Sequence, residues 1–372
     1  EAAQYLEDRS QKGFTVVLAN LLEHHFADQA PANAYGDPPF TTPGDYAAPD
    51  EAYFAHVDWV LDQAAQRGLL VLLAPSYLGW GGGDEGFYQE MVAAGATELE
   101  AYGHFLGQRY RDRTNILWLH AGDYDPPDPD LVRAVANGIR AEAASHLHSA
   151  HTARHETASS VWGQEPWLDV DNVYTGTDTH GPTLALYQSA TRPLFLIEAY
   201  YEGAHDMTEE GLRAQAYGAM LAGAMGQIFG ANPMWCFGAT TCLPTTAPPT
   251  TWQQQLDSRG SQDMAVLAQL FRSFDWQALE PDASLLTSNS AGAIAARGSS
   301  GAFALLYTAT LGAVEIDLGA LSAPVQIERV DPTDGSRAPL SSGTVDNQGT
   351  FVVTLDETNG TGTDDWLVWA GP

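Results

Sequence analysis

The sequence predicts a parallel (β/α)8 barrel followed by a C-terminal antiparallel β-sandwich. Short apolar runs alternate with helical patterns over residues 1–280, which is typical of repeated βαβ units around a parallel sheet. The regular alternation and the number of units favour a closed barrel over an open sheet. Beyond residue 281 the helical patterns stop, and short β-rich runs lie between Gly, Ser, Thr and Asp turns. We therefore expect two domains, residues 1–280 and 281–372.

Seven apolar runs supply the expected barrel strands. Each run is short and bounded by turn residues, so we interpret it as a buried strand. A barrel of this type needs eight strands, and the sequence opens on a helical pattern at residues 1–12. We expect the remaining strand to precede residue 1, or another element to fill its position. The seven runs are 14–21, 69–74, 115–121, 149–152, 172–177, 194–197 and 227–231.

Helical patterns separate these strands, and two of them have recognisable ends. Asp50 is a candidate N-cap for a helix that Gly68 ends, and Thr208 is a candidate N-cap for a helix that reaches residue 223. Apolar residues at helical spacing also mark three further segments, at 99–110, 130–147 and 262–274.

The charge balance limits the expected partners. The chain has 16 Lys and Arg against 47 Asp and Glu, which gives a net charge of −31. Such a surface repels phosphate backbones and anionic lipids, so we expect neither a nucleic acid nor a membrane partner. No run approaches the ~20 apolar residues that span a bilayer. No basic and apolar leader opens the sequence, so a signal peptide is absent or removed, and we expect a secreted or periplasmic protein.

The two cysteines, Cys236 and Cys242, lie six residues apart. Zinc sites usually have four ligands, and no His or Cys pair flanks these two residues, so we expect no metal and no cofactor. Two interpretations stay open. The cysteines either form a local disulfide in an exported protein or remain free thiols.

Two of the predicted strands end in an acid. The run 115–121 is followed by Gly122 and Asp123, and the run 194–197 is followed by Glu198. In a (β/α)8 barrel the C-terminal ends of the strands form one rim, where active sites lie. Two carboxylates at one rim are the minimum requirement for hydrolysis of a glycosidic bond. We assign Glu198 as nucleophile and Asp123 as acid/base with a raised pKa. The alternative for Asp123 is a turn in which its side chain bonds the backbone.

Other polar and aromatic residues near predicted strand ends are candidates for binding a sugar. Aromatic rings suit stacking against sugar rings or forming an apolar wall beside the acid, and histidines suit its hydroxyl groups. Each of these residue types is also common as a structural element. A second carboxylate four residues after Glu198 is either the true partner of the pair or a residue that orients a neighbour. The candidates are Asn20, Tyr77, Trp80, Trp118, His151, His180, Glu202 and Trp235.

Several segments resemble the apiosidase-like glycoside hydrolases. They include the stretch Gly-Gln-Arg-Tyr-Arg-Asp-Arg-Thr-Asn-Ile-Leu-Trp at 107–118, Ala-Gly-Asp at 121–123 and Glu-Ala-Tyr-Tyr-Glu at 198–202. In that family the acids stand in Gly-Gly-Asp and Glu-Pro-x-Tyr-Glu strand ends, which places them here at Asp123 and Glu198. The C-terminal part resembles a sandwich module named as a collagen-binding domain, which commonly follows this barrel.

The chain departs from the family pattern at the rim. Ala121 replaces the first Gly and Ala199 replaces the Pro, and the family's first strand has no counterpart in the sequence. The resemblance therefore implies the fold and the acid pair, but not the identity of the sugar.

These observations predict a glycoside hydrolase that cleaves a plant or microbial polysaccharide and needs no cofactor. The rival from another class is a barrel that binds carbohydrate without cleaving it. An esterase is disfavoured because the sequence has no Gly-x-Ser-x-Gly motif.

Overall fold

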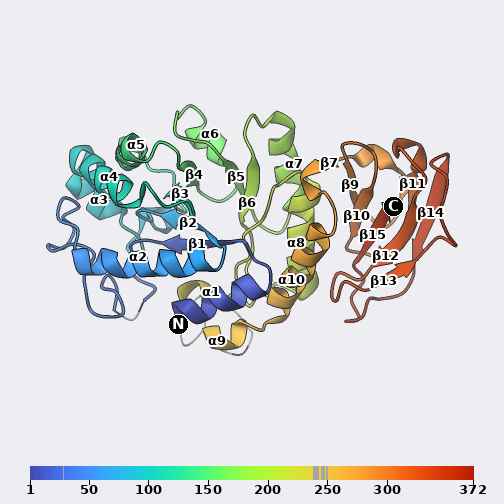
Figure 1. Cartoon of the computed structure of the whole chain (residues 1–372), viewed down its shortest axis with the longest axis horizontal. Coiled ribbons are helices and arrows are strands. Elements are labelled where there is room, and N and C mark those ends of the chain that lie inside the picture. The colour runs from blue at the N-terminus through green and yellow to red at the C-terminus, as the bar shows by residue number, and fades with distance from the viewer. Residues whose placement is uncertain (28, 238–242, 244–247, 249) are drawn as a thin grey trace.

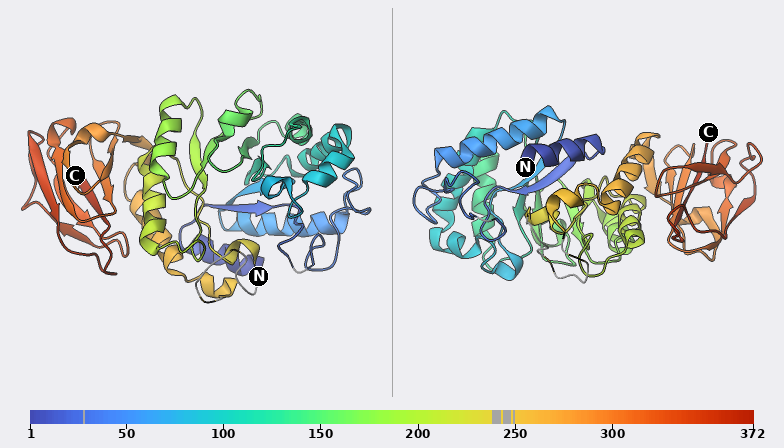
Figure 2. Two further views of the ribbon diagram at one scale, coloured as in Figure 1. Left: turned by 180° about the vertical axis from the view of Figure 1, so that it is seen from behind. Right: turned by 90° about the horizontal axis from the view of Figure 1, so that it is seen from below.

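The computed structural model describes residues 1–372 except 28, 238–242, 244–247 and 249. Parallel strands and helices form the N-terminal part, and antiparallel sheets form the C-terminal part (Figure 1). This arrangement confirms the predicted fold class. Both views of Figure 2 place the C-terminal sheets at one end of the molecule, next to α8 and α10 and remote from α2 and α4.

Six parallel strands build the described core of the barrel. They pair as a four-stranded sheet, in the order β1-β2-β3-β4, and as a second pair, β5-β6. Alternate side chains face opposite sides, so Leu117 and Leu119 pack in the interior, whereas Trp118 packs outward against the helices. The strands are β1 (Val16–Asn20), β2 (Leu70–Ala74), β3 (Ile116–Ala121), β4 (Leu147–His151), β5 (Asp171–Tyr174) and β6 (Leu194–Glu198).

The seventh predicted strand, 227–231, runs beside β6 without becoming a regular strand. It forms single parallel bridges, from Gln227 to Leu196 and from Ala231 to Glu202. No strand of the described residues pairs with the other edge of β1. A small cavity lies between β1 and 227–231, and Tyr5 and Arg9 of α1 line part of it. In the described structure, therefore, side chains of α1 border the gap where an eighth strand is expected.

Helices cover the outside of the strands, and local capping chemistry sets several of their ends. Asp50 accepts hydrogen bonds from the backbone of Ala52 and Tyr53, and Thr208 caps α8 in the same way, as predicted. The helix predicted at 130–147 ends at residue 142, because the chain turns there to start β4. The helices are α1 (Ala2–Gln11), α2 (Glu51–Gln66), α3 (Tyr88–Ala94), α4 (Ala96–Tyr110), α5 (Asp130–Glu142), α6 (Ala158–Trp162), α7 (His180–Ser189), α8 (Glu209–Leu221), α9 (Trp252–Gln255) and α10 (Arg259–Arg272).

The C-terminal part is a sandwich of antiparallel sheets. A six-stranded sheet, in the order β13-β12-β15-β10-β9-β7, packs against a three-stranded sheet, β14-β11-β8, around an apolar core. The strands are β7 (Leu279–Pro281), β8 (Leu286–Asn289), β9 (Ile294–Gly298), β10 (Ala304–Thr308), β11 (Gly312–Asp317), β12 (Gln326–Val330), β13 (Arg337–Pro339), β14 (Thr350–Leu355) and β15 (Trp366–Gly371). Short 3-10 turns complete the chain: η1 (Trp80–Gly82), η2 (Met234–Cys236), η3 (Trp276–Ala278), η4 (Ala283–Leu285) and η5 (Leu318–Ala320).

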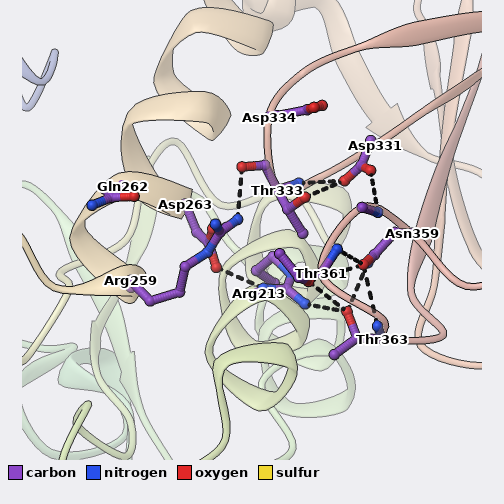
Figure 3. Close-up of polar contacts among 12 residues, drawn as sticks. Arg213, Arg259, Gln262, Asp263, Asp331, Thr333, Asp334, Asn359, Thr361 and Thr363 are labelled. Carbon is purple, nitrogen blue, oxygen red and sulfur yellow. Dashed lines mark hydrogen bonds and ion pairs between the residues drawn. The ribbon is translucent and has the colours of Figure 1, made fainter.

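The outer face of the six-stranded sheet packs on α8 and α10 of the barrel. One apolar cluster contains residues of both parts, and the rings of Tyr217 and Tyr307 stack across the interface at 5.0 Å. Arg213 of α8 lies at its centre and is fully buried (0 % exposed). Figure 3 shows its side chain pointing at Asp263 of α10 and at Thr363. The interface is therefore both apolar and ionic, with the arginine as its central charge.

Two further features bear on the cellular context. None of the described helices combines the length and the apolar character that a membrane span requires. Cys236 is bonded in a disulfide, while Cys242 lies outside the described residues.

Candidate active site

Asp123 is presented by an unusual turn at the end of β3. Ala121, Gly122 and Asp123 all have positive φ, at 63°, 134° and 52°. For a residue other than glycine this conformation costs about 1–3 kcal/mol, and such strain concentrates at functional sites. Gly122 is also sterically required, because a Cβ there would lie 2.3 Å from the Tyr77 ring. Ala121 adopts a conformation that favours glycine, which is the residue found there in the family pattern.

The turn brings Asp123 toward Glu198, at the end of β6, and His151, at the end of β4. The His151 Nε2 atom lies 3.0 Å from Glu198 Oε2 and 3.8 Å from Asp123 Oδ1. One ligand-type atom from each residue lies within 4.8 Å of the other two. We call these three residues the acid–histidine cluster. Two acids from distant parts of the chain thus face each other across one histidine.

Two tyrosines fix the remaining carboxylate oxygens of the cluster. The Tyr77 hydroxyl donates a hydrogen bond to Asp123 Oδ2 at 2.8 Å, and the Tyr201 hydroxyl donates one to Glu198 Oε1 at 2.8 Å. Asp123 Oδ1 is buried and has no hydrogen-bond partner in the described structure. Each acid is therefore held on one oxygen, while its other oxygen faces the cluster.

Burial and charge shift the proton affinities of the cluster. Burial raises the pKa of Asp123, the positive charge of His151 opposes that rise, and the negative charge of Glu198 adds to it. Burial by itself would lower the pKa of His151, but the two carboxylates outweigh burial, and the pKa of His151 is raised. Asp123 therefore keeps its proton to a higher pH than an ordinary aspartic acid does.

The same cluster is a set of donors that suits a divalent cation. Two carboxylates and one imidazole with a shared gap are common ligands of such ions, and hydrogen bonds from tyrosines to the outer oxygens resemble the support that metal ligands receive. An ion bound there would occupy the oxygens that face the gap. A bound ion would therefore prevent the same oxygens from acting as acid and nucleophile.

Trp80 is brought to the edge of the site. It lies in η1, the residue is 56 % exposed, and its backbone N–H donates to Glu85 at 2.7 Å. The same Glu85 oxygen lies 3.2 Å from the hydroxyl of Tyr77. Tyr77, Trp80 and His151 are thus the predicted binding residues that the structure places at or beside the acids.

Trp118 and Glu202 lie elsewhere and have structural partners. Trp118 has no exposed surface (0 %), and its indole N–H donates to His146 on the helix side of the strands. It therefore lines no sugar site, because side chains alternate along β3 and Trp118 faces outward. The Glu202 carboxylate accepts hydrogen bonds from Ser258 at 2.5 Å and from Gly260 N at 2.8 Å, so it holds the start of α10.

The other three candidates lie near strand or helix ends without joining the acids. Asn20 ends β1 and lies 3.5 Å from Glu23, and His180 begins α7, where burial lowers its pKa. The ring of Trp235 packs edge-on against Phe26 at 4.2 Å. No hydrogen bond or ion pair joins any of the three to the acids in the described part of the chain.

Four residues near the acids were not among the sequence-based candidates: Arg154, Tyr174, Tyr200 and Tyr201. The Tyr174 ring packs at 5.1 Å from His151, and Arg154 lies over the rings of Tyr174 and Tyr200. Only Tyr201 had a usable signal, because it follows Glu198 by three residues in the segment that resembles the family motif. Tyr200 lies in the same segment, at the position that the motif leaves open. Tyr174 ends β5 and Arg154 follows β4, and nothing in their local sequence relates these two residues to the acids.

A parallel barrel that holds two facing carboxylates at the C-terminal ends of its strands is the architecture of glycoside hydrolases, and the chain is an enzyme of this class. More specifically, it belongs to the apiosidase-like family. The model of the apiosidase-like catalytic domain matches residues 1–278. The resemblance seen in the sequence is thereby confirmed.

Solved structures show the same fold over the whole chain. A glycoside hydrolase of family 5 from Bacteroides vulgatus has a TM-score of 0.84 at 22% identity, with 100% of this chain and 85% of that chain covered. Another glycoside hydrolase has a TM-score of 0.81 at 21% identity, with 100% and 88% covered. A family 27 β-L-arabinopyranosidase from Geobacillus stearothermophilus has 0.58 at 9% identity, with 100% and 93% covered. None of the curated proteins matches the chain.

Proposed function

We propose that this glycoside hydrolase acts with retention of configuration, with Glu198 as nucleophile and Asp123 as acid/base. The observation that supports this assignment is the short distance across the acid–histidine cluster, where the facing atoms of the two acids lie within 4.8 Å. Retaining enzymes need carboxyl groups about 5–5.5 Å apart, whereas inverting enzymes need about 6.5–9.5 Å to admit a water molecule. The short gap therefore favours the retaining arrangement.

The reaction then proceeds in two steps. Asp123 gives its proton to the glycosidic oxygen while Glu198 Oε2 attacks the anomeric carbon, so the leaving group departs as an alcohol and a glycosyl ester forms on Glu198. In the second step Asp123, now ionised, takes a proton from water, and the resulting hydroxide oxygen attacks the anomeric carbon. Glu198 is released as a carboxylate, and the sugar keeps its original configuration.

The surroundings of each acid suit these roles. Burial raises the pKa of Asp123, which keeps the proton that the first step requires. Tyr201 donates a hydrogen bond to Glu198 Oε1 and so orients the carboxylate, whose Oε2 faces the gap beside His151. His151 lies between the acids, where its positive charge limits the repulsion that develops when both are ionised.

The substrate is proposed to be a plant or microbial polysaccharide, since the family resemblance points to polysaccharide degradation. We also propose that the protein is secreted or periplasmic. The disulfide at Cys236 supports this location, because disulfides persist in oxidising compartments. Fractionation of the producing cells tests the location, and recovery of the protein only from the cytoplasm would argue against it.

The stereochemistry of the product tests the proposed reaction. A panel of aryl glycosides and oligosaccharides would first identify a cleaved substrate, and proton NMR would then follow the first-formed anomer. We expect the product to have the configuration of the substrate. An inverted product would contradict the assignment, and glycan binding without turnover of any substrate would favour the non-catalytic barrel.

The pH profile of a His151→Gln variant is a further prediction. His151 lowers the pKa of Asp123, so removing its charge should raise that pKa and move the basic limb of kcat/KM to higher pH. The control is His104→Gln, because His104 lies on α4 and pairs with Glu142 away from the site. A basic limb that stays in place, or moves to lower pH, would show that His151 does not act on the catalytic proton.

Metal removal and addition give another prediction. We expect the parent enzyme to keep its full rate in EDTA, because its acid and nucleophile are side chains. Zn²⁺ should inhibit by bridging the two acids and His151, and His151→Gln should be less sensitive to Zn²⁺. Steady-state rates at increasing free Zn²⁺ measure both effects. Activity that disappears in EDTA and returns with a divalent cation would instead indicate a metal-dependent hydrolase.

A further inference from the structure

Arg154 lies three residues after β4 and is held among three aromatic rings. The carbon of its guanidinium group lies 5.5 Å from the centre of the Trp80 ring, 5.3 Å from that of Tyr174 and 5.6 Å from that of Tyr200. The three rings come from segments at the ends of β2, β5 and β6. The arginine is therefore fixed at the rim of the barrel by residues from three separate strand ends.

The same rim segments carry the acid–histidine cluster. The Tyr174 ring packs against His151, and Tyr200 follows Glu198 by two residues. Trp80 is tied to Tyr77 through Glu85, and Tyr77 donates to Asp123. Arg154 is therefore on the side of the barrel where the sugar must enter.

The hydrogen-bonding groups of Arg154 are largely unused. One N–H donates to the Tyr174 hydroxyl at 3.2 Å, and the buried Nε has no hydrogen-bond partner. Arg109 and Arg133, in contrast, each pair with two carboxylates. Within the described part of the chain, no carboxylate lies at ion-pair distance from Arg154, although acids outnumber basic residues by 47 to 16.

We propose that Arg154 determines specificity by binding an anionic group of the substrate, a carboxylate or a sulfate, on a sugar next to the bond that is cleaved. This inference rests on the proposed function and names the class of its substrate. A guanidinium group that is held by ring faces keeps its N–H donors in plane, where they can bind two oxygens of one anion. The local positive charge also offsets the repulsion that a chain of net charge −31 exerts on an anionic glycan.

A structural role for Arg154 makes a different prediction. If the guanidinium only supports the rings of Trp80, Tyr174 and Tyr200, its removal should weaken binding of neutral and anionic glycans alike. If it binds an anion, its removal should affect only glycans that carry the charge. A matched pair of ligands that differ in that charge alone distinguishes the two roles.

The test measures binding rather than turnover. An array of neutral, uronate-containing and sulfated oligosaccharides is probed with the Glu198→Gln variant, and bound members are retested by calorimetry after methyl esterification or desulfation. We expect binding to anionic members, and an affinity roughly 10- to 100-fold lower once the charge is removed. If esterification lowers the affinity, the anion is a carboxylate. If desulfation lowers it, the anion is a sulfate.

Variants of Arg154 in the same background complete the test. Arg154→Gln should bind charged and uncharged members of a pair equally, Arg154→Lys should keep part of the preference, and Arg133→Gln should keep all of it. Unchanged preference in Arg154→Gln, a preference of the parent for neutral glycans, or no binding to any anionic member would overturn the inference. Anion-dependent binding without turnover of any bound glycan would leave this inference standing and reject the proposed function.

Discussion

Replacing Glu198 with Gln is expected to lower kcat by at least about 10⁴-fold, because the amide cannot form the glycosyl ester on which both steps depend. The substitution keeps the shape of the side chain, and the Tyr201 hydroxyl can still donate to its oxygen. The fold should therefore be unchanged. Initial rates on the best aryl glycoside, together with the melting temperature, measure the two effects.

The acid at residue 202 provides a matched control. Glu202 follows Glu198 by four residues but holds the start of α10 instead of facing the gap. Glu202→Gln should therefore keep substantial turnover per folded molecule. Near-parental rates in Glu198→Gln, combined with loss of turnover in Glu202→Gln, would contradict the assignment of the nucleophile.

Asp123→Asn separates the roles of the two acids. Removing a general acid costs roughly 10²- to 10⁴-fold, but the loss shrinks for leaving groups that need no protonation. We expect a large defect on natural glycans and a smaller one on activated aryl glycosides, with partial rescue by azide. An equal defect on both substrate classes would contradict the role of Asp123 as acid.

Replacing Arg213 with Met should lower the free energy of unfolding by about 3–5 kcal/mol, the usual cost of removing one partner from a buried ionic cluster. Arg213 bonds Asp365 through two nitrogens, at 2.7 and 2.8 Å, and bonds Asp263 at 2.6 Å. The side chains of both acids are fully buried (0 % exposed). Without Arg213, Asp365 loses its ion pair and Asp263 keeps only the ion pair with Arg259. Urea denaturation of the full chain measures the change.

Arg133→Met is the control for that experiment. Arg133 also contacts two carboxylates, but its side chain is 39 % exposed. Removal of such a surface pair usually costs less than about 1 kcal/mol. Equal destabilisation by both variants, or no effect of Arg213→Met, would show that Arg213 does not hold the barrel and the sandwich together.

Local chemistry in the sequence was sufficient for much of the fold. The caps at Asp50 and Thr208 were predictable because each side chain bonds its own helix start. The buried strands were predictable because their apolar runs are short and uninterrupted. The segment 227–231 shows the limit of this reasoning, since an apolar run becomes a regular strand only where a neighbour supplies a ladder of hydrogen bonds.

The site was harder to predict than the fold. Both acids could be chosen as strand-end carboxylates, but their distance depends on the turn of three residues with positive φ at 121–123. Trp118 was wrongly expected beside the sugar because it is close to Asp123 in the sequence. Side chains alternate along β3, so Trp118 faces the helices instead. Arg154 gave no local signal, because the three rings around it come from distant segments that only the folded barrel brings together.

Covalent trapping is the most direct test of the central claim, that Glu198 attacks the sugar while Asp123 supplies the proton. An activated 2-deoxy-2-fluoro glycoside of the best substrate should inactivate the enzyme with one sugar bound per chain. Mass spectrometry of peptides should then place the added sugar on Glu198. A sugar on any other residue, or hydrolysis of the reagent with inversion and no covalent adduct, would contradict the account.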